Sequence, residues 1–529
     1  MRHRTALGLV LLAACARTTP PAATPSPAAT PQITADELRR DLAIFASDSF
    51  AGRETGTPGA WRAAQFLATR LMELGVEPAG DSLYYQRVAL VREGIASTTQ
   101  LSTTQGGIST PLPLGAGIVP WTNLGAGAPV PRRTAEGDLV FAGYGMNSLG
   151  RNDFRGVTDA GKVIVMVHEA PPEIKDSTTR KNLESQDELA QRLLRALQLR
   201  PAAIILLMNG GTRDFYSMLA PELMRAVSPA PGDQTTSDAQ RPLPMVLVGL
   251  AAPGSPLLPA GWPNDNAPQA LTGRRFVGRV DVRKEPFIAY NVVGIVRGSD
   301  ARLNKSYVAF GAHYDHIGIQ NGMTPDSIAN GADDDGSGSV TMLAVARALQ
   351  AVKPRRSGLF VWHVGEEKGL LGSAYFTDHP TVPIDSIVAQ LNADMIGRDA
   401  GPTSTFDTRV SGAAMTNKLY IVGPNAAPNN QSRVLGAILD TVNARQSAPM
   451  QLDHEWDSTT HPEKLYERSD HYNYAKKGIP IVFFTTGLHE DYHKVSDEPQ
   501  KIDYAKMARI GNLLVQMGET VANRETRPR

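Results

Sequence analysis

Helical periodicity marks both ends of the sequence. Residues 35–46 carry apolar side chains at helical spacing, and Thr34 stands directly before them as a suitable N-cap. Residues 59–74 repeat the pattern and stop at Gly75, a residue type that commonly ends helices. The same spacing predicts further helices over residues 186–199, 338–349, 432–443, 471–477 and 504–521.

Short apolar runs in the C-terminal half predict β-strands. They cover residues 307–311, 359–364, 387–394, 418–422 and 481–485. From Ala289 onward these runs alternate with the predicted helices. Alternation of this kind is typical of an α/β fold, so we expect a mostly parallel central sheet with helices on both faces.

The middle of the chain follows a different pattern. Apolar runs at residues 138–144, 162–168, 203–208 and 244–249 are separated by Gly, Pro and Asn, with one predicted helix among them. We therefore predict a separate, strand-rich domain over residues 135–285. It would be inserted into a larger domain formed by residues 33–134 and 286–529.

The N-terminus has the layout of an export signal. A basic start is followed by a short apolar stretch, and residues 1–14 end in Leu-Ala-Ala before Cys15. This resembles a bacterial lipobox, so we expect cleavage before Cys15, lipidation of its thiol and attachment of the protein to a membrane. The outer membrane facing the periplasm is the expected location. Residues 15–32 are rich in Pro, Ala and Thr and read as a tether.

Composition narrows the function classes. The 53 Lys and Arg residues balance the 53 Asp and Glu residues, so the basic excess typical of nucleic-acid binders is absent. Cys15 is the only cysteine, which excludes an internal disulfide and a zinc site built on several thiolates. Composition does not indicate an oligomeric state.

Acidic residues and histidines gather where predicted strands end. The five segments are His313-Tyr314-Asp315, Asp333-Asp334-Asp335-Gly336-Ser337-Gly338, Glu366-Glu367, Asn392-Ala393-Asp394 and Tyr492-His493. Loops at the carboxyl ends of parallel strands meet at one edge of a sheet, so we expect these segments to converge. Imidazoles combined with carboxylates suit zinc, with cobalt or manganese as alternatives. An excess of carboxylates favours two ions, with one carboxylate shared between them.

The ordered set of five segments resembles the co-catalytic di-zinc aminopeptidase family, which also contains glutamate carboxypeptidase and the glutaminyl cyclases. The resemblance covers residues 33–110 and 286–525. The inserted region resembles a protease-associated domain, through Gly143-Tyr144-Gly145 and Gly161-Lys162-Val163-Ile164.

The family resemblance implies a role for each residue. The implied zinc ligands are His313, Asp334, Glu367, Asp394 and His493, with Asp334 shared by the two ions. Glu366 would act as general base, Asp315 would orient His313, and Tyr492 would donate a hydrogen bond to the oxyanion. The resemblance also implies a cis peptide bond between Asp334 and Asp335.

The expected activity is that of an aminopeptidase, which removes N-terminal residues from peptides by means of a metal-bridging hydroxide. A carboxypeptidase or dipeptidase of the same fold is the alternative, and it would use an arginine such as Arg398, Arg409 or Arg468 for the substrate carboxylate. A scaffold or binding protein without activity would be expected to lack ligands or the base, and this sequence keeps all of them.

Overall fold

The computed structural model describes residues 31–115, 117–122, 131–155, 157, 160–213, 216, 220, 223–230, 243–320, 326–399, 417–461 and 463–528. The predicted signal peptide, Cys15, nearly all of the tether and Arg409 lie outside these residues.

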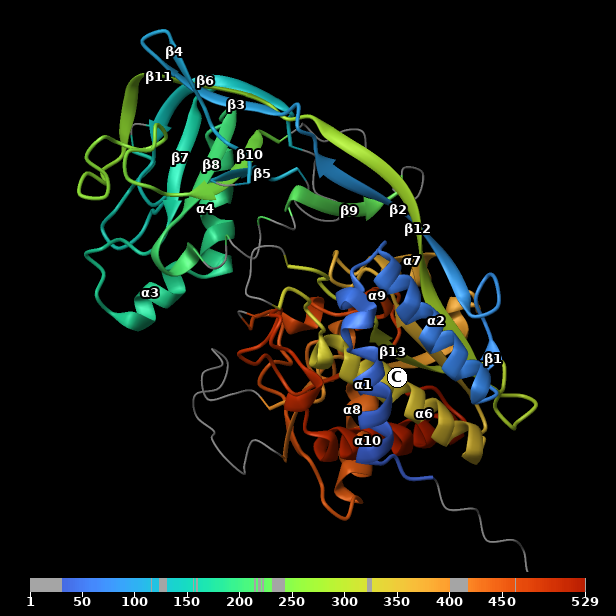
Figure 1. Cartoon of the computed structure of the whole chain (residues 1–529). Helices are drawn as coiled ribbons and strands as arrows, with labels where there is room; N and C mark the ends of the chain where they lie inside the picture. Colours follow the sequence, from blue (N-terminus) through green and yellow to red (C-terminus); the bar gives the residue numbers. More distant parts are fainter. Residues whose placement is uncertain are drawn as a thin grey trace, which may run out of the picture.

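The larger part of the molecule is built on one mixed β-sheet (Figure 1). Its strand order is β17 (Gln451–Asp453), β16 (Lys418–Val422), β18 (Ile481–Thr485), β15 (Ile387–Ala393), β13 (Tyr307–His313), β14 (Ser357–His363), β12 (Val282–Val296), β2 (Tyr85–Ile95) and β9 (Arg225–Pro229), and β1 (Glu77–Pro78) pairs with β12. The central neighbours β18, β15, β13 and β14 are parallel. Pairing becomes antiparallel at β12 on one side and at β16 on the other, so the predicted parallel sheet is limited to the centre and the β16–β17 pair.

Helices cover both faces of this sheet, as predicted. Alternate residues of a strand point to opposite faces. In β13, Val308, Phe310 and Ala312 pack into one core, whereas Tyr307 and Ala309 pack into another. The first core holds α1 (Ala35–Phe45), α2 (Pro58–Glu73), α6 (Gly338–Val352), α8 (Arg433–Ala444) and α10 (Tyr504–Asn523), and the second holds α7 (Leu371–Asp378) and α9 (His471–Lys476).

A second sheet lies apart from the first in Figure 1. Its order is β4 (Ile108–Pro111), β3 (Gln100–Gln105), β11 (Gln269–Arg279), β6 (Thr134–Phe141), β7 (Val163–His168), β8 (Ala203–Met208), β10 (Met245–Leu250) and β5 (Ile118–Pro120). Helix α4 (Gln186–Gln198) packs on one face and α3 (Ser177–Leu183) precedes it. The sheet thus takes strands from residues 100–120 as well as from the middle of the chain. The long β2–β12 pair leads from one sheet to the other (Figure 1).

The α/β class and most of the predicted elements are confirmed. Thr34 caps α1 by accepting a hydrogen bond from the main-chain N–H of Glu37. No helix in the described part of the chain is both long and apolar enough to span a membrane.

Candidate metal centre

Four neighbouring strands deliver most of the predicted site residues to one edge of the large sheet. His313 ends β13, Glu366 and Glu367 follow β14, Asp394 directly follows β15, and His493 lies in the loop after β18. Asp334 comes from the turn that precedes α6. The predicted convergence is therefore observed, because parallel pairing of β18, β15, β13 and β14 places all four carboxyl ends side by side.

Asp334 lies between two histidines. Its Oδ1 atom is 3.2 Å from Nε2 of His313, and its Oδ2 atom is 3.2 Å from Nε2 of His493. Asp394 extends the first group, with Oδ1 3.6 Å from Nε2 of His313, and Glu367 extends the second, with Oε2 2.9 Å from Nε2 of His493. Ligands held ~2.0–2.1 Å from a tetrahedral zinc ion are about 3.3 Å apart, so both groups have suitable spacing for zinc.

The neighbouring aspartates are already engaged by the main chain. Asp335 accepts hydrogen bonds from the N–H groups of His313, Gly338 and Met395. Asp333 accepts one from Gly397 and faces Nε2 of His489 at 3.2 Å. Asp334 alone of the three turns its carboxylate toward His313 and His493. The peptide bond between Asp334 and Asp335 is cis, as the family resemblance implied.

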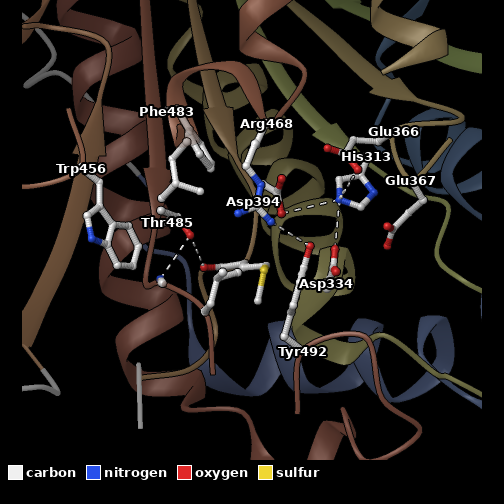
Figure 2. A pocket seen from close by; sticks show the side chains of 14 residues that line it. His313, Asp334, Glu366, Glu367, Asp394, Trp456, Arg468, Phe483, Thr485 and Tyr492 are labelled. Atoms are coloured by element: carbon white, nitrogen blue, oxygen red, sulfur yellow. Dashed lines mark hydrogen bonds and ion pairs between the residues drawn. The ribbon is translucent and has the colours of Figure 1, made fainter. Parts of the chain in front are cut away.

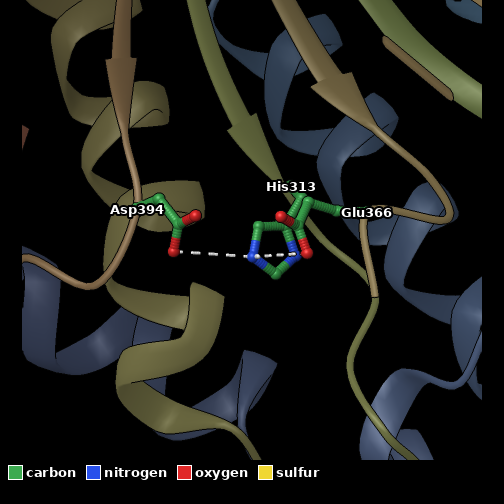
Figure 3. A group of neighbouring side chains, drawn as sticks. All are labelled: His313, Glu366 and Asp394. Carbon is green, nitrogen blue, oxygen red and sulfur yellow. Dashed lines mark ion pairs between the residues drawn. The ribbon is translucent and has the colours of Figure 1, made fainter. Parts of the chain in front are cut away.

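Two further side chains adjoin these groups. Oε2 of Glu366 lies 3.9 Å from Nε2 of His313, so His313, Glu366 and Asp394 form one cluster of possible ligand atoms (Figure 3). Nδ1 of His316 lies 2.7 Å from Oε1 of Glu367 and 3.8 Å from Oδ2 of Asp334, which completes a second cluster. Sequence reasoning placed His316 outside the ligand set, and its closeness to Glu367 is a contact that the sequence did not reveal.

A layer of hydrogen bonds holds the ligands from behind. Nδ1 of His313 lies 3.1 Å from the main-chain oxygen of Asp315 and 3.8 Å from the Asp315 carboxylate. Asp315 is thus the expected partner of His313, but it acts mainly through its main-chain oxygen. The carboxylate of Asp315 accepts hydrogen bonds from Thr55 Oγ1 and from the main-chain N–H of Glu366. Ser469 Oγ donates to Oδ2 of Asp394 at 2.7 Å. Such partners fix the direction in which a ligand points.

Burial and charge act in opposite directions on these groups. Burial alone would raise the pKa of Asp334, but hydrogen bonds with His313 and His493 hold it well below its usual value. Burial also favours raising the pKa of Glu367, yet His493 and His316 bring it to about 2. Glu366 lacks comparable compensation, so burial raises its pKa well above the ordinary value. The site therefore combines two carboxylates of lowered pKa, Asp334 and Glu367, with one of raised pKa, Glu366.

A pocket opens beside the two clusters (Figure 2). On one side it is lined by the apolar residues Met395, Trp456, Leu465, Phe483 and Leu488. Trp456 and Leu465 belong to the segment between α8 and α9.

Polar groups complete the pocket. The ring of Tyr492 stacks on that of His493, with centroids 3.9 Å apart, and Arg468 donates to the Tyr492 hydroxyl at 3.4 Å. Burial raises the pKa of Tyr492 to about 12, which keeps its hydroxyl protonated near neutral pH.

A sheet edge that gathers carboxylates and imidazoles beside a pocket gives this α/β protein a site with ligands suited to metal ions. The model of Peptidase family M28 matches residues 291–518, the part of the chain that contains all five predicted ligands. Residues 291–518 are therefore similar to that family, in agreement with the predicted resemblance.

Curated relatives agree with this assignment. A probable leucine aminopeptidase of Trichophyton verrucosum is 30% identical over 266 residues, which are 48% of this chain and 64% of that protein. A probable leucine aminopeptidase of Arthroderma otae is 32% identical over 222 residues, which are 40% of this chain and 53% of that protein. The chain thus covers less than two thirds of the length of these relatives.

Solved structures share the fold over nearly the whole chain. An aminopeptidase from Aneurinibacillus sp. strain AM-1 superposes with a TM-score of 0.56 at 18% identity, covering 94% of this chain and 96% of that one. The zinc aminopeptidase BSAP from Bacillus subtilis gives 0.53 at 17% identity, with 94% and 97% covered. At these identities the likeness is one of fold.

The hydrogen bond from Ser469 to Asp394 generates a prediction. Replacing Ser469 with alanine frees Asp394 Oδ2 to turn away from the first cluster, so affinity for a divalent metal should fall about 10-fold or more. Competition with a chromogenic chelator measures this affinity. The matched control is Ser432→Ala, a fully buried serine that binds the main chain of Ile481 away from the site. Equal affinities in the two variants would contradict the orienting role.

Proposed function

We propose that the chain is a di-zinc aminopeptidase. The observation that carries the proposal is the position of Asp334, whose two oxygens each face the histidine of a separate ligand cluster at 3.2 Å. A carboxylate placed in this way suits two cations that share it, and paired ions are a recurrent device for hydrolysis.

The donor set supports zinc at both positions. His313 and Asp394 would hold one ion, His493 and Glu367 the other, and Asp334 would contribute one oxygen to each. Imidazole and carboxylate are both common zinc ligands, and each set of three leaves a position open for water or substrate. The bound ions would supply Lewis acidity, which polarises the substrate carbonyl and makes water more acidic.

Glu366 is proposed to move the proton. Its side chain is 11% exposed at the edge of the first cluster, and its main-chain N–H donates to the Asp315 carboxylate at 3.2 Å. A base in this position takes a proton from the attacking water and later delivers it to the departing amine. Burial, which raises the pKa of Glu366, favours this exchange because it brings the carboxyl closer to neutral pH.

Tyr492 and Arg468 are proposed to bind the oxygen of the substrate carbonyl. Both line the pocket, and the guanidinium holds the Tyr492 hydroxyl in place. Donors that are fixed before the reaction stabilise developing negative charge more effectively than mobile ones.

Charge favours the N-terminal direction of attack. The pocket lining includes the four acids Asp334, Glu366, Glu367 and Asp394, which would attract the free ammonium of a peptide. The apolar wall beside it suits the first side chain of such a peptide. The names of the two fungal relatives support the same direction.

One observation favours a second candidate function. Arg468 lies in the pocket and would also bind a substrate carboxylate, as a carboxypeptidase or dipeptidase requires. Arg398 is a weaker candidate because it is not among the residues that line this pocket, and its guanidinium binds Asp491 at 2.9 Å.

Two accessory features complete the proposal. The second sheet is proposed to be a protease-associated domain that restricts access to short or unfolded peptides. Cys15 is proposed to carry lipid that attaches the protein to a bacterial membrane, with the outer membrane favoured.

Substrates with a free or blocked N-terminus separate the two directions. Leucyl-anilide should be cleaved and its N-acetyl derivative should not, because acetylation removes the ammonium that the carboxylates attract. Release of the chromophore measures both reactions, with chelator-treated protein as the blank. Cleavage confined to N-acetylated dipeptides that carry a free carboxylate would establish the carboxypeptidase alternative instead.

Replacement of Glu366 with glutamine tests the base. We expect kcat to fall about 10²–10⁴-fold, because the amide cannot accept the proton. Metal content, measured by elemental analysis, should stay at the wild-type level. Glu490→Gln, at an exposed position three residues before His493, is the matched control and should keep its kcat. Activity that survives in Glu366→Gln would exclude Glu366 as the base.

Lipidation is tested in a bacterium that processes lipoproteins. The wild-type chain should incorporate an alkyne-tagged fatty acid and sediment with membranes, whereas Cys15→Ser should do neither. An unlabelled wild-type chain would refute the anchor without affecting the catalytic proposal.

A further inference from the structure

Arg53 is fully buried behind the proposed metal centre, and nothing in the sequence predicted a role for it. All five of its N–H donors point at main-chain oxygens. Nε donates to Tyr314 at 2.8 Å, one terminal nitrogen donates to Phe45 at 3.3 Å and Asn330 at 2.5 Å, and the other donates to Gly331 at 2.8 Å and Asp334 at 3.5 Å. A guanidinium has five donors in a fixed plane, and here each one is used.

These acceptors belong to three separate pieces of the chain. Phe45 ends α1, Tyr314 lies between His313 and Asp315, and residues 330–334 form the turn that carries Asp334. One side chain therefore joins the segment that supplies the first histidine to the segment that supplies the shared carboxylate.

The backbone around Arg53 is also unusual. Ala51, Gly52 and Arg53 all have left-handed conformations, with φ values of 49°, 67° and 51°. Such a conformation is strained for a residue with a Cβ atom, because the Cβ crowds the following carbonyl oxygen. At Gly52 an added Cβ would lie 2.6 Å from the carbonyl oxygens of both Ala329 and Gly318. This strained backbone brings residues 51–53 into close contact with the loops at residues 316–318 and 329–331.

Neighbouring contacts reinforce the same loop. The N–H of His316 donates to the Arg53 oxygen at 3.3 Å, and the N–H of Gly318 donates to the Gly52 oxygen at 3.0 Å. Thr55 Oγ1 donates to the Asp315 carboxylate at 2.7 Å. Residues 52–55 thus run alongside residues 315–318 and hold them in register.

Charge gives Arg53 a second effect on the site. Burial lowers the pKa of Arg53 to about 10, and the carboxylates of Asp334 and Asp497 oppose that change. Asp497 in turn accepts hydrogen bonds from the N–H groups of Asp333 and Asp334. The guanidinium stays charged at neutral pH and offsets the repulsion among the acids around it.

We propose that Arg53 is a positioning residue that sets the distance between the two ligand clusters by clamping the His313 loop to the Asp334 turn. The inference rests on the proposed di-zinc function, because its consequence is the affinity of the site for metal. The hydrogen bonds of Arg53 end on main-chain oxygens, including that of Asp334, and not on the ligand side chains, so its effect passes through the main chain.

The test compares two buried arginines. Arg192, in the second part of the molecule, is also fully buried and donates to the main-chain oxygens of Glu169 and Leu183. Arg53→Lys keeps the charge but has too few donors for five oxygens, and Arg53→Met removes both charge and donors. Arg192→Lys is the matched control for the general effect of disturbing a buried arginine.

Zinc affinity of the full chain, measured by chelator competition, is the primary readout, and thermal unfolding of the metal-free protein is the second. We expect both lysine variants to unfold at lower temperature than the wild-type chain. Of these two, only Arg53→Lys should lose zinc affinity, by at least about 10-fold, and Arg53→Met should lose more. Added zinc should restore part of the activity of Arg53→Lys. If Arg53→Met does not fold, Arg53→Lys still provides the comparison.

Unchanged zinc affinity in Arg53→Lys, beside a wild-type chain that binds zinc, would overturn the positioning role alone. An equal loss of affinity in Arg192→Lys would overturn it too, since the effect would then be general. A wild-type chain that binds no divalent metal would overturn the proposed function and this inference together.

Discussion

The rest of this structure depends on how the repulsion among carboxylates crowded into one buried site is offset. Two like charges ~4 Å apart repel by about 4 kcal/mol in surroundings of intermediate dielectric, and this site brings together four acids in its pocket and further buried acids behind it. Asp333 and Asp335 are satisfied by main-chain N–H groups, and Asp497 by the turn that it supports. The carboxylate of Asp334 instead faces the imidazoles of His313 and His493 beside the pocket, a position that suits a carboxylate shared by two cations.

The ligand positions depend first on strand pairing and core packing outside the site. Parallel pairing of β18, β15, β13 and β14 aligns four loop origins along one edge, and the large hydrophobic core under α6 and α10 keeps those strands in place. The precision of the ligand positions then comes from polar contacts, since Ser469 orients Asp394 and Asp315 orients both His313 and Glu366. The hydrophobic core fixes where the loops start, and these hydrogen bonds fix where the side chains point.

Sequence reasoning succeeded where the signal is local. The strands at 203–208, 418–422 and 481–485 were predicted with their observed bounds, because each is a compact apolar run between turn residues. The ligand segments were visible because their acids and histidines follow such runs directly. The second sheet was harder, since β3 is mostly polar and β5 has only three residues, and both are identified by their pairing with β11 and β10.

Residues whose role is created by tertiary contact escaped prediction. Arg53 lies about 260 positions from Tyr314 and is indistinguishable in the sequence from a surface arginine. His316 was visible as a histidine, but its contact with Glu367 depends on the path of the loop after β14. The local feature next to Arg53 that could have indicated its role is Gly52 in the left-handed turn at residues 51–53, and a single glycine is too common in sequences to predict such a turn.

The count of zinc ions per chain tests the central claim most directly. Metal-free protein is titrated with zinc, dialysed against a weak chelator and analysed for zinc and protein in the same sample, alongside Asp334→Ala. The account predicts two tightly bound ions in the wild-type chain and at most one in Asp334→Ala, since that substitution removes an oxygen from both clusters. One ion or none in the wild-type chain, or two ions in both proteins, would contradict it.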